Sequence, residues 1–212
     1  GFLSDGEVIA LVAPGGSVDW MCVPRFDSPS IFGKVLGRYA GAFRISPVDV
    51  EVPADVRYLP GTMIIETSWG TSTGWIVVRD ALLMGPWRHD ETRSKNHRRT
   101  PTDYDAEHVR LRTVRCVSGE VQISMECEPV FDYGRKIASW DYTDHGYHQG
   151  VATTDGVDLR LTLTTDLRLG FEGGQASART LLKEGDTRYV ALSWGSKPPP
   201  LTYAEAYARQ VW

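Results

Sequence analysis

Apolar and polar residues alternate strictly from Val121 to Glu128, and this run constrains the fold more than any other feature of the chain. Successive side chains of a β-strand point to opposite faces, so a period of two predicts a strand with one buried face. Further strand-like runs occur at residues 7–12, 18–22, 43–45, 63–69, 75–78, 109–116, 157–163, 167–169 and 189–192. Together they predict an all-β fold, a large antiparallel β-sandwich (supersandwich) of about a dozen strands without an interior helix.

The pattern at residues 109–116 changes phase partway along. Its apolar positions are first odd and then even, in the order Val109, Leu111, Val114 and Cys116, while Arg110 and Arg112 fill the alternate positions of the first half. An extra residue in one strand shifts the alternation by one position. The slip therefore predicts a β-bulge near Thr113.

The chain has three cysteines, Cys22, Cys116 and Cys127, an odd number without close spacing. Ser118-Gly119 predicts a tight turn between two neighbouring strands, which would place Cys116 opposite Val121 and leave Cys127 well down the ladder. A disulfide between them is therefore not expected. Free buried thiols in a reducing compartment fit better, and they indicate a cytoplasmic location.

Length and composition exclude some classes of function. A chain of 212 residues buries about 70% of its extended surface, so it needs no metal or disulfide to fold. The net charge of −4 argues against nucleic acid as a partner. No apolar run is long enough to cross a membrane, and no signal segment opens the chain. Because the chain begins at Gly1 without Met, we expect that a preceding piece is missing.

Residues 15–33 read GGSVDWMCVPRFDSPSIFG, a central stretch that combines a turn, a predicted strand and a polar cluster. The strand expected at residues 18–22 buries three side chains, Val18, Trp20 and Cys22. Pro24 ends this strand, because proline has no N–H for the ladder. The cluster Arg25-Phe26-Asp27 follows, and it has two interpretations. The charged pair either ties down a surface loop or faces a ligand.

Several motifs spread over the chain carry a family resemblance. They are Phe2-Leu3-Ser4-Asp5, Ser17-Val18-Asp19-Trp20, Pro24-Arg25-Phe26-Asp27-Ser28-Pro29-Ser30, Arg57-Tyr58-Leu59-Pro60-Gly61-Thr62, Val78-Arg79-Asp80-Ala81, Gly85-Pro86-Trp87, His97-Arg98-Arg99-Thr100-Pro101 and the run from Cys127 to Tyr133. On these residues the chain resembles the start of glycoside hydrolase family 15 enzymes. Within that family it is most similar to the actinobacterial α,α-trehalases, with bacterial glucoamylases next.

The resemblance implies the N-terminal β-sandwich domain of an enzyme that hydrolyses trehalose to two glucoses with inversion. It places both catalytic glutamates in an (α/α)6 barrel beyond Trp212, so no catalytic residue is expected in this chain. The sandwich is expected to pack against that barrel, to shape one wall of its sugar pocket and to take part in a homo-oligomer. The residues expected at the pocket rim are Arg25, Phe26, Asp27, Asp132 and Tyr133.

Two alternatives stay open. A glucoamylase or dextran glucosidase of the same family would share this domain, because trehalose and maltose differ mainly at a subsite set by barrel loops. From a different class, a non-catalytic carbohydrate-binding or assembly module would present an exposed, coplanar aromatic strip. Most tryptophans fall in predicted strands and are expected in the core, with Trp87 and Trp140 as exceptions.

Three further groups of polar residues were considered as catalytic, anion-binding or metal-binding sites. Glu126 and Glu128 are spaced like a pair of catalytic carboxylates, but they occupy the polar phase of a strand and are expected to be solvated. The basic loop at residues 88–99, with Arg98 and Arg99, is either solvated, an anion site for a group such as phosphate, or a contact for an acidic subunit. His145 and His148 lie three apart on a non-helical segment, a spacing that fixes no metal site.

No metal or cofactor is predicted for this domain, and the resemblance leaves a dependence on phosphate and Mg²⁺ open. Residues 1–196 are expected to form the sandwich. Lys197-Pro198-Pro199-Pro200 predicts a stiff linker, and Thr202 and Glu205 have the spacing of a helix capping box. Residues 197–212 are therefore expected to be a linker and the first helix leading into the catalytic barrel.

Overall fold

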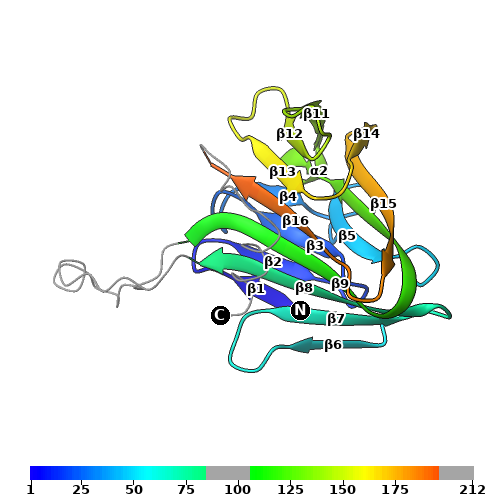
Figure 1. The fold of residues 1–212 in the computed structure, drawn as a ribbon. Helices are drawn as coiled ribbons and strands as arrows, with labels where there is room; N and C mark the ends of the chain where they lie inside the picture. The colour runs from blue at the N-terminus through cyan, green and yellow to red at the C-terminus, as the bar shows by residue number, and fades with distance from the viewer. Residues whose placement is uncertain (85–105, 196–212) are drawn as a thin grey trace, which may run out of the picture.

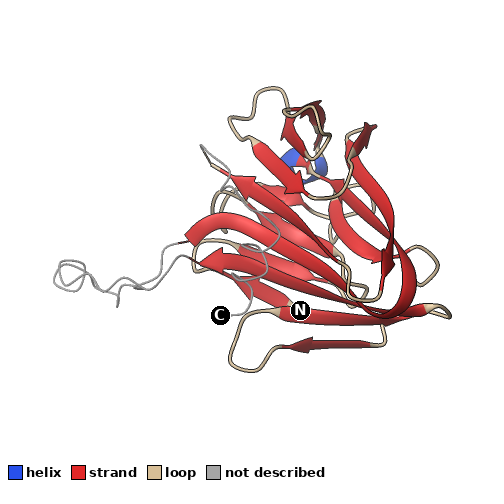
Figure 2. Ribbon diagram, viewed as in Figure 1, coloured by secondary structure: helices blue, strands red, loops and turns tan. Residues whose placement is uncertain are grey.

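The computed structural model describes residues 1–84 and 106–195 of the chain. This part is almost entirely β-structure with one short helical turn, so the all-β prediction is confirmed (Figure 1, Figure 2). Within these residues no helix is long and apolar enough to cross a membrane. The predicted linker and helix at residues 197–212, with the boundary after residue 196, lie outside the described part.

The longest strand, β9 (Ala106–Glu128), joins two sheets. Its first half pairs with β8 (Gly74–Met84) and β16 (Thr187–Trp194), in what we call sheet B. Its second half pairs with β5 (Ala42–Pro47) and β15 (Gln175–Lys183), in sheet A. Figure 1 shows β9 as a long green strand that curves from one layer of the sandwich into the other.

All described strand pairs are antiparallel, as predicted. Sheet A also contains β1 (Phe2–Ser4), β2 (Ile9–Val12), β3 (Val18–Cys22), β4 (Ser30–Phe32) and β14 (Gly170–Glu172). Sheet B also contains β6 (Asp55–Tyr58), β7 (Ile65–Gly70), β11 (Ser139–Tyr142), β12 (Gln149–Thr153) and β13 (Leu161–Thr165). After β9 come the short turn α2 (Phe131–Gly134) and β10 (Lys136–Ile137). The paired network holds 15 strands, somewhat more than the predicted dozen.

Ser118 and Gly119 bend β9 instead of turning it back. The predicted hairpin is therefore wrong, and Cys116 lies opposite Ile76 of β8. Gly119 has φ +69°, and a Cβ there would lie 2.1 Å from the Thr73 carbonyl oxygen. Only glycine fits this close approach of the β7–β8 hairpin to the bend. The three cysteines are nevertheless free and buried, as predicted.

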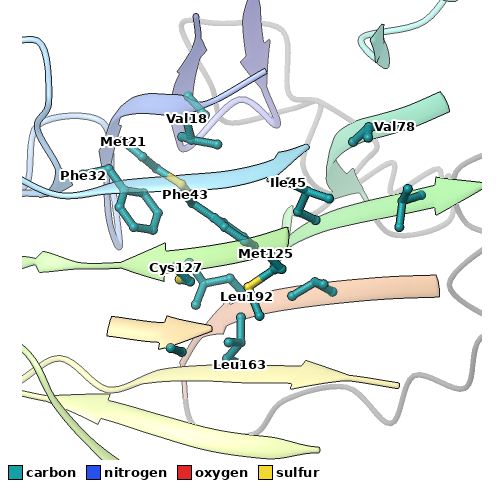
Figure 3. Packing of buried hydrophobic residues seen from close by; sticks show 14 of the residues in the cluster. Val18, Met21, Phe32, Phe43, Ile45, Val78, Met125, Cys127, Leu163 and Leu192 are labelled. Carbon is teal, nitrogen blue, oxygen red and sulfur yellow. The ribbon is translucent and has the colours of Figure 1, made fainter. Parts of the chain in front are cut away.

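The hydrophobic core lies between the two sheets. Figure 3 shows Phe43, Met125 and Cys127 of sheet A facing Leu163 and Leu192 of sheet B. All five side chains are fully buried. Burial of a side chain of this size contributes about 1.5–3 kcal/mol, so this interlayer contact stabilises the sandwich substantially.

β9 passes Thr113 without a bulge, so the predicted bulge is wrong. Its pairing with both neighbours keeps a constant register from Leu111 to Arg115. The phase changes because both faces of this segment are buried. One face joins a second apolar cluster on the outer side of sheet B, and the other faces the core; their residues are Val109 and Leu111 on the first, and Arg110, Arg112, Val114 and Cys116 on the second.

Other strand predictions need smaller corrections. The alternating run at residues 157–163 forms a strand only from Leu161 onward, and residues 167–169 are not in a strand. Strands β11, β12, β14 and β15 were not predicted. Their residues contain glycine, serine and threonine in place of a long apolar run, so the sequence pattern is weak there.

Candidate functional site

The β3–β4 tip, residues 24–29, carries three of the predicted rim residues. Arg25 and Asp27 form a two-pronged ion pair, in which Arg25 Nε and Nη2 donate to Asp27 Oδ1 and Oδ2 at 3.0 and 3.2 Å. The hydrogen bond from Arg25 lowers the pKa of the Asp27 carboxyl. Both side chains are largely exposed, at 64% and 55%. Phe26 between them is 57% exposed, so the tip presents a charged pair and a free aromatic ring.

The tip contacts a group of residues that the sequence did not single out, namely Glu7, His108 and Trp194. Phe26 N donates to Glu7 O at 2.8 Å. Glu7 Oε2 lies 2.9 Å from His108 Nε2, and the His108 ring centroid lies 6.2 Å from that of Trp194. His108 has φ +57°, which is uncommon outside glycine. No local pattern could have found this cluster, because its Glu7–His108 contact joins residues 101 positions apart.

Asp132 and Tyr133, the other two predicted rim residues, lie in α2. Their φ angles are +53° and +59°, and Gly134 follows at +82°, so three consecutive residues are left-handed. This conformation costs an L-residue roughly 1–2 kcal/mol and persists only where the surroundings enforce it. A Cβ on Gly134 would lie 2.5 Å from Ala40 Cβ. The turn is therefore held tightly against the loop that follows β4.

Trp20, predicted for the buried face of β3, instead lies half-buried on the outer face of sheet A. Leu11 is opposite Trp20, but Val12 is opposite Val18, so Asp19 is an extra residue in β3. Such a bulge turns the following side chains to the other face. Val18 and Met21 are both fully buried as a result, although their parity differs.

One group of predicted rim residues lies at the tip of the β3–β4 hairpin, the other lies in α2 near β3, and the two groups do not touch. The Tyr133 ring lies 6.4 Å from that of Trp20 in β3, with an angle of 31° between the ring planes. Arg25, Phe26 and Asp27 lie beyond Cys22, at the tip of the same hairpin. Within the described ranges no hydrogen bond, ion pair or ring contact joins the two groups. The two groups therefore form separate candidate surfaces, one at the β3–β4 tip and one where α2 lies near β3.

A fully buried ionic cluster lies in the core beneath the start of β3. Arg110 Nη2 donates to Asp80 Oδ1 at 2.9 Å, and Arg112 Nε lies 2.6 Å from the same oxygen. None of the three side chains has exposed surface. Burial lowers the pKa of Arg110 to about 10. Among the described residues Arg110 Nε and Nη1 have no hydrogen-bond partner.

The second arginine of this cluster connects the sheets. Arg112 Nη1 and Nη2 donate to the carbonyl oxygens of Phe43 and Gly16, both at 2.6 Å. Its guanidinium also lies over the Phe43 ring, 4.8 Å from the centroid. Gly16 belongs to the turn that leads into β3, so Arg112 fixes the strand that carries the tip. This role was not predictable from the sequence pattern, because alternation alone assigns arginine to a solvent-facing position.

A cavity with a volume of about 270 Å³ lies beside the β11–β12 loop. It is lined by Tyr142, Thr143, Asp144, His145 and Tyr147. Next to it Trp140 stacks on Phe171 and Phe171 on Tyr142, with ring centroids 5.2 and 4.1 Å apart. These rings cover one another's faces, so they do not form an open, coplanar strip.

Of the two histidines of this loop, His145 lines the cavity, and His148 is held by hydrogen bonds. His148 Nδ1 lies 2.9 Å from the Leu167 carbonyl oxygen, and its backbone N–H donates to Asp144. Asp144 also accepts from Gln149 N, so this carboxylate closes the loop. In the described ranges no group of three or more His, Cys, Asp or Glu side chains is placed to hold a metal ion.

Glu126 and Glu128 are half-buried, not fully solvated as predicted, because β9 lies between β5 and β15 in the middle of sheet A. Glu126 lines a small cavity of about 110 Å³ that also contains Arg44 and Arg179. A carboxylate beside two guanidinium groups suits a surface ion network better than an acid–base pair. The predicted anion residues Arg98 and Arg99, and Trp87, lie outside the described residues.

Comparison with known proteins identifies a family and several relatives that the chain resembles. Residues 1–82 match the trehalase-like N-terminal domain family. The chain is 56% identical over its whole length to a trehalase of Mycobacterium tuberculosis, of which it covers 31%. It is equally similar to a trehalase of Mycolicibacterium smegmatis, of which it covers 32%. A trehalase of Sulfolobus acidocaldarius is 32% identical over 63% of the chain and 19% of that relative.

The chain thus spans about a third of the length of the mycobacterial relatives that it matches. The family match begins at residue 1 and includes β3, the β3–β4 tip and β5. The identity to the mycobacterial proteins continues through α2 to the last strand. The chain is a trehalase-like N-terminal domain.

Proposed function

We propose that this chain is the non-catalytic N-terminal domain of an α,α-trehalase of glycoside hydrolase family 15. The whole protein would hydrolyse trehalose to two glucoses with inversion, using glutamates of an (α/α)6 barrel outside this chain. The observation that carries the proposal is the 56% identity to two mycobacterial trehalases over the full chain. The remaining two thirds of those relatives leaves room for the catalytic domain.

Within that enzyme we assign the β3–β4 tip to one wall of the sugar pocket. Two features support this role. The Arg25–Asp27 pair is held in a fixed, two-pronged geometry at the surface, which suits hydrogen bonding to hydroxyl groups. Phe26 is exposed between them, although a phenylalanine ring gains by burial. The tip would therefore complete a site whose reacting groups come from the barrel.

Asp132 and Tyr133 form a second proposed part of the rim. Their left-handed backbone supports this, because strain of this kind persists mainly where a particular side-chain position is needed. We also propose a cytoplasmic location, with which the three free buried thiols agree. A homo-oligomer is part of the same proposal, resting on the family resemblance.

The test is glucose release by the full-length parent protein from trehalose, maltose and dextran at equal concentrations of glucosyl units. We expect release from trehalose alone. Release from maltose or dextran in preference to trehalose would identify a glucoamylase or dextran glucosidase instead. If no sugar is cleaved, the enzyme proposal fails, and a carbohydrate-binding or assembly module takes its place.

A further inference from the structure

The pairing of β8 with β9 is irregular at the start of β9, where residues 107–109 lie opposite the single residue Leu83. In a regular strand His108 would share the inward face of Arg110, because alternate side chains point the same way. The bulge and the left-handed backbone of His108, with φ +57°, turn its ring outward instead. The side chain is 44% exposed as a result and reaches Glu7.

The stability of the fold does not explain this deviation. A left-handed φ is unfavourable for an L-residue and persists only where the surroundings enforce it. The contact that it makes possible joins His108 Nε2 and Glu7 Oε2 at 2.9 Å, and the two side chains are 44% and 52% exposed. Such an exposed pair contributes little to stability, because water solvates both partners. A role other than stability is therefore indicated for the contact.

The His108 ring has a fixed support on its other side. Its centroid lies 6.2 Å from that of Trp194, with 53° between the ring planes. Trp194 is the last residue of β16 and is only 2% exposed. The ring that contacts Glu7 is therefore held by sheet B, whereas Glu7 lies between two strands of sheet A.

The β3–β4 tip depends on Glu7 for its direction. Its internal contacts are the Arg25–Asp27 ion pair and the hydrogen bond from Arg25 N to Ser28 Oγ, and they fix its shape. Phe26 N donates to the Glu7 carbonyl oxygen at 2.8 Å. Among the described residues this is the only hydrogen bond or ion pair between the tip and an element outside its own hairpin.

The Glu7 backbone is itself held from below. Glu7 N and Val8 N both donate to Asp5 Oδ1, at 3.0 and 2.7 Å, and Asp5 is 5% exposed. This leaves the side chain of Glu7 as the part that links the loop to sheet B. A connected path of contacts thus runs from the bulge in β9, through His108 and Glu7, to Phe26.

We propose that Glu7 and His108 are positioning residues, which set the direction of the tip and thereby of Arg25 and Asp27. His108 holds the side chain of Glu7, and the Glu7 carbonyl holds Phe26. Neither positioning residue touches the substrate. The consequence for trehalose hydrolysis rests on the proposed function, whereas the link to the tip rests on the geometry.

The first readout is hydrogen exchange of the Phe26 amide in the full-length protein, labelled with ¹⁵N-phenylalanine and assigned from the loss of its resonance in Phe26→Leu. In Glu7→Ala and in His108→Asn we expect this amide to exchange about tenfold faster, because its hydrogen bond opens more often. Asparagine tolerates the left-handed backbone but is too short to reach Glu7. The amide of Phe43, buried in β5, should keep its wild-type rate, which shows that the fold is intact.

The second readout is the kinetics of trehalose cleavage by the same variants. A pocket wall binds the sugar alike in the ground state and in the transition state, so a misdirected tip should raise KM about threefold and leave kcat unchanged. The double variant Glu7→Ala/His108→Asn should be no worse than either single variant, because both remove one contact. Glu7→Gln keeps an oxygen that accepts from His108 Nε2 and should retain wild-type exchange and KM.

Glu120→Ala is the matched control, since the Glu120 side chain is 54% exposed and pairs with Lys183. It should change neither the exchange of Phe26 nor KM. An unchanged Phe26 exchange rate in both Glu7→Ala and His108→Asn would overturn the inference. So would a double variant in which the two losses add, because the residues would then act independently.

Failure of this inference and failure of the proposed function are distinguishable, because hydrogen exchange does not require activity. A protein that cleaves trehalose, with equal Phe26 exchange in wild type and Glu7→Ala, disproves the positioning role alone. A protein that cleaves no trehalose, with faster Phe26 exchange in Glu7→Ala, disproves the proposed trehalase and leaves the link to the tip standing.

Discussion

Two arginine–aspartate groups of this chain have the same chemistry and opposite surroundings. Asp80, Arg110 and Arg112 have no exposed surface, whereas Arg25 and Asp27 are more than half exposed. Buried charges that lose their partner are strongly destabilising, while exposed ion pairs contribute little because water solvates each partner well. Loss of one member of the buried group should therefore destabilise the sandwich, whereas loss of the exposed pair should not.

The largest effect is expected from Asp80→Asn. It leaves two buried guanidinium groups without a counter-charge and should cost about 3–5 kcal/mol. Hydrogen exchange of the β9 amides in the full-length protein measures this loss. Asp166→Asn is the control. Asp166 accepts a hydrogen bond from Tyr189 N, but burial disfavours its charged form and raises the pKa of its carboxyl, so loss of this charge should cost less. A loss below about 1 kcal/mol in Asp80→Asn would contradict the structural role.

The two buried arginines should differ from each other. Arg112→Met leaves the carbonyls of Phe43 and Gly16 unpaired and should cost about 2–4 kcal/mol. Arg110→Met removes a cation whose Nε and Nη1 have no partner in the described part of the chain, and should cost about 1 kcal/mol or less. The free energies of unfolding of the two variants are measured in urea at equal protein concentration. Equal losses would show that Arg112 does not connect the sheets.

Glu66 is an intermediate case and gives a pH test. Burial raises the pKa of its carboxyl, but hydrogen bonds from Arg57 and Arg79 outweigh that and lower the pKa below the ordinary 4.5. A lowered carboxyl pKa adds stability above the unfolded-state value, which is lost as the pH falls through the folded-state value. Wild type should therefore lose stability more steeply than Glu66→Gln below about pH 4.5. If the melting temperatures of wild type and Glu66→Gln fell equally between neutral and acidic pH, the prediction would be contradicted.

The smallest effect on stability is expected at the tip. Arg25→Ala should leave the melting temperature unchanged, because both partners of its ion pair are well solvated. Lys183→Ala is a matched control, since Lys183 and Glu120 form a pair of nearly equal exposure, 68% and 54%. Calorimetry of the two variants beside wild type compares them. A lower melting temperature in Arg25→Ala alone would mean that the Arg25–Asp27 ion pair stabilises the loop at the tip.

The fold class was predictable from the sequence, and the positions that matter for function were only partly so. The alternation at residues 121–128 identified a strand correctly because one face of that segment is buried and the other is not. Arg110 and Arg112 follow the same rule in appearance, yet they face the core, because both faces of β9 are covered there. A period of two shows that faces differ but does not show which face is inside.

Of the candidate site, the sequence identified the contacts between neighbouring residues and missed those that depend on strand pairing. The Arg25–Asp27 pair forms between neighbours in the sequence, so local reasoning found it. Trp20 was assigned to the wrong face because its position depends on how β2 pairs with β3, which inserts Asp19 as an extra residue. His108 and Glu7 were missed because their contact depends on the whole topology. Register and long-range contacts follow from tertiary packing, which a single sequence does not display.

The most direct test of the division between buried and exposed ion pairs is kcat/KM for trehalose in the full-length protein, measured together with the melting temperature. We expect Arg25→Ala and Asp27→Ala to lower kcat/KM by about tenfold or more at an unchanged melting temperature, since a charged hydrogen bond to a substrate is worth about 1.5–3 kcal/mol. Lys183→Ala should change neither quantity. Full activity in both tip variants, or activity that falls only as far as the melting temperature does, would contradict a functional role for the tip.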